Sequence, residues 1–367
     1  MCTSSALFIL RIIVLLPIRL IQGGIKTFRL GALSGNILVR VFMREALLLC
    51  DKTTFKDVLN PLFDMCLSIC LGKKSFEVVS YPFKDLQTEA LASQTANIST
   101  KFYWYCKPDN FDPETDPLII FSHGGGFAIK AVPTSLFFFR NLSRLYPRTS
   151  IVMHDYTVTD MDHDSVRHPR QLLETVALYL HFSTILHYKN ITMIGESAGG
   201  HLVLSLLHYL ETRHLHLPRK VVAVSPWCNP NVCDPEERRK APCNGSLDSL
   251  SFKGLDKFTA LLKPSDPIYN ADPLLNLETN FTPDTWNAVL KQTQIMVTYG
   301  RQEVLKFQIE KFVSKLAQLP SAPANLTVYE DGNGGHIEPF LNFQRNETVW
   351  SMQPNIASIL KFLEQGP

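Results

Sequence analysis

The sequence predicts an α/β fold in which helices flank a mostly parallel central sheet. Short β-rich runs alternate with helical segments from about residue 99 onward, the order expected of a doubly wound sheet with right-handed crossovers. Several of these runs are continuously apolar, as strands are when helices cover both faces of a parallel sheet. The composition agrees, because 45% of the 367 residues are hydrophobic and 19% are charged, enough to bury a large core.

Seven apolar or β-branched runs are predicted as strands, and the segments between and after them include five predicted helices. The predicted strands are 101–106, 118–123, 150–156, 191–197, 221–227, 294–300 and 326–331. The predicted helices are 134–146, 168–187, 198–213, 303–319 and 351–364. We therefore place the main domain at residues 99–367.

One interval inside this domain breaks the alternation. Residues 229–292 are rich in Pro, Asp, Asn and Ser and contain no clear strand. The interval is too long for a bare connection in a compact domain. We interpret it as a cap inserted over the carboxyl ends of the strands, where such sheets place their sites. Residues 26–98 are expected to supply a linker and the remaining helices of the cap.

The first 25 residues are predicted to form a membrane anchor. Residues 6–21, ALFILRIIVLLPIRLI, are the most apolar stretch of the chain, although Arg11 and Arg19 interrupt it. A cleaved signal peptide or an amphipathic helix in the membrane interface are the alternatives, but no small-residue cleavage site follows cleanly. A second apolar stretch, residues 30–50, carries Arg40 and Arg44 in its middle and is typical of an interfacial or core helix.

Sequons and cysteines bear on the compartment. Glycosylation sequons begin at seven asparagines, more than chance predicts, and this favours the secretory lumen; they are Asn97, Asn141, Asn190, Asn244, Asn280, Asn325 and Asn346. The basic residues that follow the anchor favour the cytosol instead, so the luminal placement is a hypothesis. An oxidising lumen would permit one disulfide among Cys228, Cys233 and Cys243, and free buried thiols are the alternative.

The overall charge excludes one broad class of partner. The chain carries 36 basic and 34 acidic residues, a formal charge of +2, with no long run of either sign. Nucleic-acid-binding proteins need a concentrated cationic surface to displace counterions. We therefore expect no nucleic-acid partner.

The segment Gly195-Glu196-Ser197-Ala198-Gly199 fits the pattern G-x-S-x-G at the end of an apolar run and the start of a predicted helix. The motif requires a sharp turn that exposes the serine oxygen, and the close backbone approach requires the flanking glycines Gly195 and Gly199. The amide of Ala198, at the first position of the helix, is free to donate to an oxyanion. In this setting Ser197 is the candidate nucleophile.

A glycine-rich loop follows an earlier strand. His123 is followed by Gly124, Gly125 and Gly126, whose unobstructed amides suit an oxyanion hole for acyl transfer. A flexible turn, or a phosphate loop without its lysine, is the alternative. The order of this loop and then G-x-S-x-G is more specific than either motif alone and indicates a serine hydrolase. We expect His123 to hold the loop in shape and not to transfer protons.

The remaining catalytic groups follow in the order acid and then histidine. Glu303 comes just after the run QIMVTYG and can orient an imidazole, whereas its rival Asp331 directly precedes the histidine loop and is typical of a turn. Among the 11 histidines, His336 lies on the loop after the last predicted strand, where the general base must reach Ser197. Acyl transfer by these groups needs no metal and no organic cofactor.

These motifs resemble the hormone-sensitive-lipase family of α/β hydrolases, and a narrower resemblance is to the fungal steryl acetyl hydrolases. The segments similar to that narrower family are VLNPLF (58–63), STKFYWY (99–105), NFDPETDP (110–117), DYTVT (155–159), SPW (225–227), VTYGRQEVLKFQ (297–308) and GGHIEPFLNF (334–343). The resemblance implies the α/β-hydrolase fold and a Ser197, Glu303 and His336 triad. It departs from the wider family at positions 196 and 303, where this chain has Glu in place of the commoner Asp.

The same resemblance implies an enzyme that removes acetyl groups from sterols at the endoplasmic reticulum membrane. Its partner would be a small-molecule sterol ester, and a single-pass anchor would hold the catalytic domain at the membrane, on the luminal side. The alternatives are a carboxylesterase or lipase of broader specificity and a non-catalytic hydrolase-fold protein that binds sterol. Nothing in the sequence specifies an oligomeric state.

Overall fold

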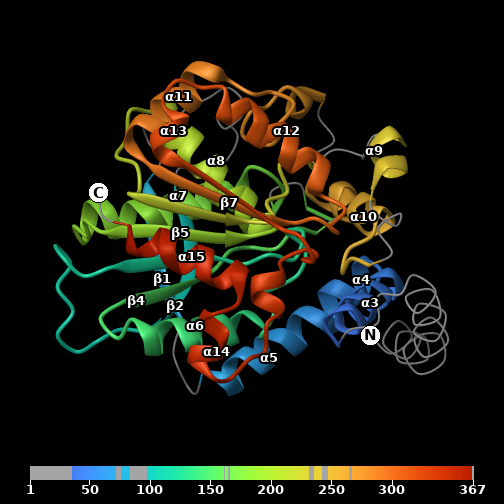
Figure 1. Ribbon diagram of the computed structural model, residues 1–367, viewed down its shortest axis with the longest axis horizontal. Coiled ribbons are helices and arrows are strands. Elements are labelled where there is room, and N and C mark those ends of the chain that lie inside the picture. The colour runs from blue at the N-terminus through green and yellow to red at the C-terminus, as the bar shows by residue number, and fades with distance from the viewer. Residues whose placement is uncertain are drawn as a thin grey trace.

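The computed structural model is built around a twisted central sheet (Figure 1). It describes residues 35–71, 76–82, 97–160, 162–163, 166–230, 235–241, 247–263 and 267–365. The eight strands lie in the order β1-β2-β4-β3-β5-β6-β7-β8. They are β1 (Glu77–Pro82), β2 (Asn97–Cys106), β3 (Leu118–Ser122), β4 (Ser150–Asp155), β5 (Ile191–Glu196), β6 (Lys220–Val224), β7 (Gln294–Gly300) and β8 (Leu326–Asp331).

The six strands β3 to β8 are parallel to one another, as predicted. Every residue of β3, β5 and β6 is buried, because helices cover both faces of the sheet. Several predicted strands continue one to three residues beyond the observed ends. The reason lies in the backbone, because Ser197 and Ser225 adopt φ values of 54° and 48°, which turn the chain out of the sheet.

The other edge of the sheet is antiparallel and includes a strand that the sequence did not predict. Strand β1 pairs antiparallel with β2, and β2 pairs antiparallel with β4, so the sheet is mixed. Within β1 Val79 is buried and Val78 is exposed, because helices cover only one side of this edge. A short edge strand with one covered face has a weak hydrophobic pattern, which explains why β1 was missed and β2 was predicted to begin four residues late.

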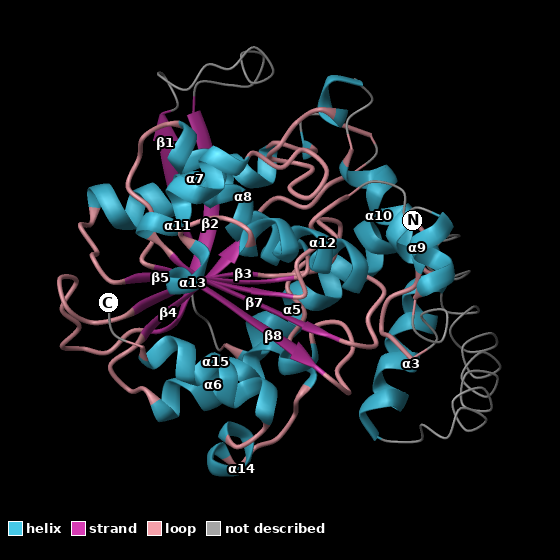
Figure 2. Ribbon diagram, turned by 45° about the horizontal axis from the view of Figure 1, so that its top comes forward, coloured by secondary structure: helices cyan, strands magenta, loops and turns pink. Residues whose placement is uncertain are grey.

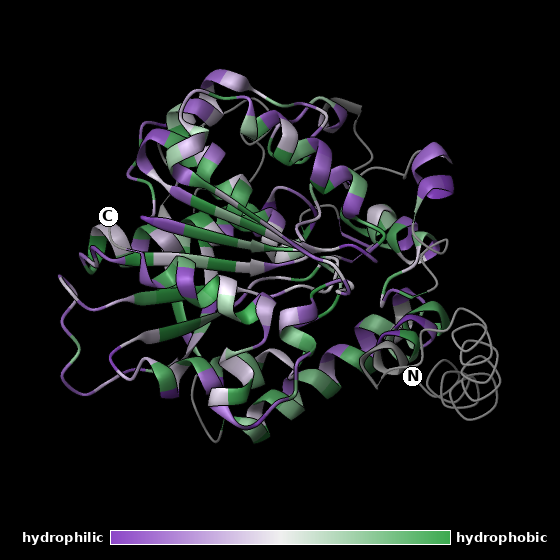
Figure 3. Ribbon diagram, in the orientation of Figure 1, coloured by the Kyte–Doolittle hydropathy of each residue, from purple (hydrophilic) through white to green (hydrophobic). Residues whose placement is uncertain are grey.

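Helices cover the two faces in separate layers (Figure 2). One layer includes α7 (Arg170–Leu180), its π-helical continuation η4 (His181–Ile185), α8 (Ala198–Thr212), α11 (Pro283–Gln292), α12 (Lys306–Ala317) and α13 (Ala322–Asn325). The opposite layer includes α6 (Ser135–Leu145), η7 (Glu338–Leu341), α14 (Glu347–Ser351) and α15 (Pro354–Glu364). Apolar residues concentrate in the strands between the layers, whereas the short surface helix α9 (Pro235–Lys240) is hydrophilic (Figure 3).

Two parts of the chain come together beyond the carboxyl ends of the strands. The first contributes α3 (Gly35–Leu49), α4 (Lys52–Thr54), η2 (Phe55–Leu59) and α5 (Asn60–Cys70). The second, inside the interval 229–292, contributes α9, α10 (Phe252–Leu262) and η6 (Pro267–Asn270). Helix α10 contacts α3, whereas α11 in the same interval packs on α8 beside the sheet. The described residues of this interval contain no strand, but they divide between a layer of the sheet and the region above it.

None of the helices in the described ranges is long and apolar enough to cross a membrane. Residues 1–25, which are predicted to form the anchor, lie outside those ranges. The apolar stretch 30–50 contains helix α3, whose Arg40 and Arg44 are both buried, so this part of the chain packs against the protein.

Candidate active site

Ser197 occupies the turn between β5 and α8, the position that the G-x-S-x-G pattern predicts. Its backbone adopts φ 54° and ψ −116°, a strained conformation that lifts the side chain above the sheet. Both glycines are required by close backbone approach. A Cβ atom on Gly195 would lie 2.1 Å from the carbonyl oxygen of Gly199, and one on Gly199 would lie 1.9 Å from that of Ser122.

The glycine-rich loop lies beside this serine. Gly125 and Gly126 adopt φ values of 99° and 58° and line the same cavity as Ser197. Ala198 is the first residue of α8, so its amide has no partner within the helix. Gly124 differs from the prediction, because its amide donates to Glu196 Oε1 at 3.3 Å and the residue does not line the cavity. The oxyanion donors compatible with this geometry are the amides of Gly125, Gly126 and Ala198.

His123 holds the loop in shape through buried contacts. Its Nδ1 lies 2.7 Å from the carbonyl oxygen of Gly124, and its ring stacks on Tyr156 with the centroids 4.1 Å apart. The Tyr156 hydroxyl donates to the carbonyl oxygen of His123 at 2.8 Å. Burial lowers the pKa of His123 to about 4. A neutral imidazole fixed in this way fits a structural role.

His336 and Glu303 meet beyond the ends of β8 and β7. His336 Nδ1 lies 3.4 Å from Glu303 Oε2, and both side chains are buried. Asp331, the rival acid, is a turn residue, because its carboxylate accepts from the amide of Asn333 at 3.1 Å and from Asn355 Nδ2 at 3.0 Å. Of the two carboxylates that the sequence offered, the structure places Glu303 beside the imidazole.

Burial dominates the electrostatics of this pair. It raises the pKa of Glu303 to about 8, and the positive charge of Arg40 opposes that rise. It also lowers the pKa of His336 to about 4. In both cases the charged form loses its contact with water. The resting imidazole is therefore neutral and able to accept a proton.

Sequence reasoning missed Asp248, which ties the two loops of the pair together. Its Oδ2 accepts from the amide of Val304 and its Oδ1 accepts from the amide of His336, both at 2.8 Å. It is fully buried, and burial raises its pKa. The surrounding segment, Leu247 to Leu250, has no recognisable pattern, so no local signal could have identified this residue.

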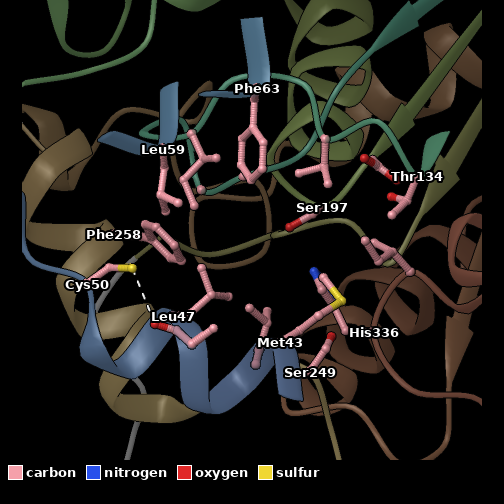
Figure 4. Close-up of a pocket in the computed structure, with 18 of the residues that line it drawn as sticks. Met43, Leu47, Cys50, Leu59, Phe63, Thr134, Ser197, Ser249, Phe258 and His336 are labelled. Carbon is pink, nitrogen blue, oxygen red and sulfur yellow. Dashed lines mark hydrogen bonds between the residues drawn. The ribbon is translucent and has the colours of Figure 1, made fainter. Parts of the chain in front are cut away.

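A cavity of about 500 Å³ opens above Ser197. Ser197 and His336 both line it, and α3, η2, α5 and α10 supply much of the remaining lining (Figure 4). The lining is mainly aliphatic and aromatic. The apolar side chains that Figure 4 labels around it are Met43, Leu47, Leu59, Phe63 and Phe258. Within the described ranges no cluster of three His, Cys, Asp or Glu side chains could hold a metal ion.

The structure bears on the predicted disulfide and on some of the predicted glycosylation sites. Cys228 is a free buried thiol, so a disulfide through this residue is excluded, while Cys233 and Cys243 lie outside the described residues. Asn141 is fully buried and donates to the carbonyl oxygen of Gln344 at 2.8 Å, so this sequon is not accessible to a glycan in the folded chain. Asn346 is exposed, and Asn280 and Asn325 are partly exposed.

Comparison with known proteins identifies the family of this chain. The sequence matches the steryl acetyl hydrolase family model over residues 6–362. It is 34% identical over 343 residues to steryl acetyl hydrolase 1 of Saccharomyces cerevisiae, covering 89% of this chain and 80% of the relative.

Solved esterases share the fold at low sequence identity. An esterase of Pyrobaculum calidifontis superposes with a TM-score of 0.62 at 16% identity, covering 89% of this chain and 99% of the other. A thermostable esterase of Pseudomonas putida gives 0.60 at 15%, covering 90% and 95%. Both likenesses identify the fold as that of α/β hydrolases. The chain is a carboxylic ester hydrolase of the steryl acetyl hydrolase family.

Proposed function

We propose that this protein removes the acetyl group from steryl acetates, with Ser197 as nucleophile, His336 as general base and Glu303 as the acid that orients it. The observation that carries the proposal is that a strained serine and a neutral, buried histidine line the same apolar cavity. The family and the relative from Saccharomyces cerevisiae support the substrate class.

The reaction would proceed in two acyl-transfer steps. Nε2 of His336 accepts the proton of Ser197 as the serine oxygen attacks the acetyl carbonyl. The amides of Gly125, Gly126 and Ala198 stabilise the oxyanion, and collapse breaks the ester bond while His336 returns the proton to the sterol oxygen. Water, deprotonated by His336, then attacks the acetyl-serine. The bond between the acetyl carbon and the Ser197 oxygen breaks, His336 returns the proton to that oxygen, and acetate leaves. These steps need neither a metal nor an organic cofactor.

The cavity supports a short acyl group and an apolar alcohol. Phe258 on α10 closes the space beside the oxyanion loop, because a Cβ atom on Gly126 would lie 2.4 Å from Cγ of its ring. Little room therefore remains for an acyl chain longer than acetyl on that side. The larger apolar volume, walled by α3 and α5, suits a fused hydrocarbon ring system, for which burial is favourable by about 25 cal/mol per Å².

The test compares steryl acetates with steryl esters of longer acids and with a panel of p-nitrophenyl esters. We expect steryl acetate to give the highest kcat/KM. We also expect a fluorophosphonate to label the wild type, with labelling and turnover lost in Ser197→Ala. A matched control is Ser205→Ala, which alters a buried serine on α8 that donates to the carbonyl oxygen of Leu274. Turnover of many p-nitrophenyl esters without steryl acetate hydrolysis would instead support a broad carboxylesterase.

We also propose that the protein works at a membrane surface. Helix α5 exposes Leu62, Met65 and Ile69 along one face, with exposed fractions of 42%, 54% and 72%. Leu62 also lines the cavity, so the apolar surface is continuous with the substrate site. Met65→Asp/Ile69→Asp should lower turnover of steryl acetate in vesicles but not in detergent, whereas Ile185→Asp, an exposed apolar residue on η4, should change neither. Equal loss in both media would contradict the proposal.

The proposed location is the endoplasmic reticulum membrane, with one anchor in the first 25 residues and the catalytic domain in the lumen. The sequons support this placement, and Asn346 is the most exposed among those described. Endoglycosidase treatment of the protein from cells should increase its gel mobility, and Asn346→Gln should reduce that change. An unchanged mobility would remove the luminal assignment.

A further inference from the structure

Helix α3 contributes a buried arginine to the loop that carries His336. Only 3% of Arg40 is exposed, and its Nη2 lies 2.6 Å from Glu338 Oε2. The same nitrogen donates to the carbonyl oxygen of Asn333 at 3.0 Å, a contact that spans 293 positions of the sequence. One guanidinium therefore joins the N-terminal helix to the last loop before η7.

The two acceptors lie on either side of the catalytic histidine. Asn333 precedes His336 by three positions and Glu338 follows it by two. The Glu338 carboxylate also accepts from the amide of Gly335 at 3.2 Å. Arg40 and Glu338 together therefore restrain the backbone on both sides of the imidazole.

Gly335 lies against the same arginine. A Cβ atom on Gly335 would lie 2.8 Å from Cδ of Arg40 and 2.9 Å from its Nε. The arginine side chain thus lies directly against the residue that precedes His336, and a side chain at position 335 would displace it.

The buried Arg40 guanidinium is expected to add little to the stability of the fold. Within the described residues, Nε and Nη1 of Arg40 are buried without a hydrogen-bond partner. Burying a charge that is only partly satisfied offsets much of the attraction of its ion pair. The free-energy cost of burying this charge is explained if the guanidinium has a role in positioning the His336 loop.

We propose that Arg40 is a positioning residue that holds the His336 loop in its catalytic conformation. This inference rests on the proposed roles of Ser197 and His336. From the side of the sheet, the loop is held by Asp248, which accepts from the amide of His336 at 2.8 Å, and by Ser225, whose Oγ accepts from the amide of Ile337 at 3.0 Å. Arg40 provides the opposing restraint, from α3. Without it the loop is restrained from one side only, and misplacement of the imidazole lowers the rate of proton transfer.

Arg40 also affects the pair of Glu303 and His336 through its charge. The titratable groups around the pair are Asp248, Cys228, Tyr299, Glu338 and Arg40. Burial raises the pKa of Glu303, and the positive charge of Arg40 opposes that rise. Removing the charge should therefore move the acidic limb of the pH–rate profile to higher pH.

The test measures the second-order rate constant for fluorophosphonate labelling of Ser197 and the turnover of p-nitrophenyl acetate in the full-length protein. Arg40→Met should lower both kcat and the labelling rate by about 10- to 100-fold, with little change in KM, and should raise the pH of the acidic limb. Arg40→Lys keeps the charge but cannot reach both acceptors, so it should give intermediate rates.

Arg44→Met is the matched control, because Arg44 is also buried on α3 and pairs with Glu45 instead of the loop. It should keep the wild-type limb and at least half of the labelling rate. The proposal is overturned if folded Arg40→Met keeps wild-type rates and limb, or if Arg44→Met shows the same changes. If Arg40→Met does not fold, Arg40→Lys alone decides, and wild-type rates there would overturn the proposal. Because neither readout uses a sterol, failure of the steryl acetate assignment would be seen separately.

Discussion

At the residue scale, the site is built from side chains whose conformation and charge are both constrained. Ser197 adopts a positive φ in a turn where the flanking glycines allow close backbone approach, and its side chain lines the cavity. His336 and Glu303 sit where water is excluded, which holds the imidazole neutral and opposes ionisation of the carboxyl group. The Glu303 side chain, one methylene longer than the commoner Asp, leaves its oxygen 3.4 Å from the imidazole. Closer contact is expected when the imidazole becomes charged during the attack.

The buried acid predicts an alkaline optimum. Burial raises the pKa of Glu303 from 4.5 to about 8, so the carboxyl group is protonated below that pH and cannot stabilise an imidazolium. His336 has a pKa lowered to about 4 and does not set this limb. We therefore expect kcat/KM to rise as the pH increases through about 8. A pH–rate profile tests this, with Glu303→Gln as the control that should lose the limb together with most of kcat. An acidic limb centred at 6.5, the ordinary histidine value, would contradict it.

At the element scale, helices from two distant segments wall the cavity. Helix α10 brings Phe258 against the oxyanion loop, and the ring also stacks on Phe55 of η2 with the centroids 5.6 Å apart. Helix α3 contributes Met43 and Leu47 to the facing wall. The width of the cavity beside Gly126 is thus set by packing between these helices, while Ser197 and His336 lie on the turn and loop that follow β5 and β8.

Shortening Phe258 should change acyl selectivity. Phe258→Ala opens space beside Gly126, so kcat/KM for butyrate relative to acetate esters should rise at least about tenfold, as expected for a methylene gained in an apolar pocket. The measurement compares p-nitrophenyl acetate with p-nitrophenyl butyrate. Leu262→Ala, a buried change on the same helix that does not line the cavity, should leave the ratio unchanged. An unaltered ratio in Phe258→Ala would show that another wall limits the acyl chain.

At the scale of the whole molecule, both ends of the described chain are anchored to the central sheet or to a loop that follows one of its strands. Arg40 near its start contacts the histidine loop, and α15 near its end packs on β7 and β8. Lys220 on β6 is buried, and its Nζ donates to the carbonyl oxygens of Phe362, Leu363 and Gln365 at 3.0, 2.8 and 2.5 Å. A side chain of the sheet therefore supplies the hydrogen-bond donor for the carbonyl oxygens at the C-terminal end of α15.

Replacing this lysine should loosen the C-terminal helix. Lys220→Met leaves the three carbonyl oxygens without their donor, and an unsatisfied buried group costs about 1–3 kcal/mol. We expect a lower midpoint in thermal or urea unfolding. Lys361→Met, an exposed change on α15, should shift stability by less than about 0.5 kcal/mol. Equal effects of the two variants would mean that the buried contacts contribute nothing.

Local sequence patterns were enough to predict the interior strands, the G-x-S-x-G motif and the glycine-rich loop, and the order in which they follow one another. Ser197 and the glycine loop were recognisable because a turn that exposes a nucleophile dictates its own neighbours within a few residues. The interior strands were recognisable because burial on both faces leaves a continuous apolar run. Strand β1 and the true ends of the strands were not, because edge pairing and positive φ values leave little trace in composition.

Only the tertiary structure decided which distant residues serve the site. Asp248 and Arg40 are separated from the histidine loop by 88 and 293 positions, and neither lies in a motif. Their contacts exist because the sheet brings the carboxyl ends of its parallel strands to one edge, where the loops and the helices above them meet. The same packing determines the cavity and the place of Phe258 in its wall, since the free space depends on how separate helices pack and not on any one of their sequences.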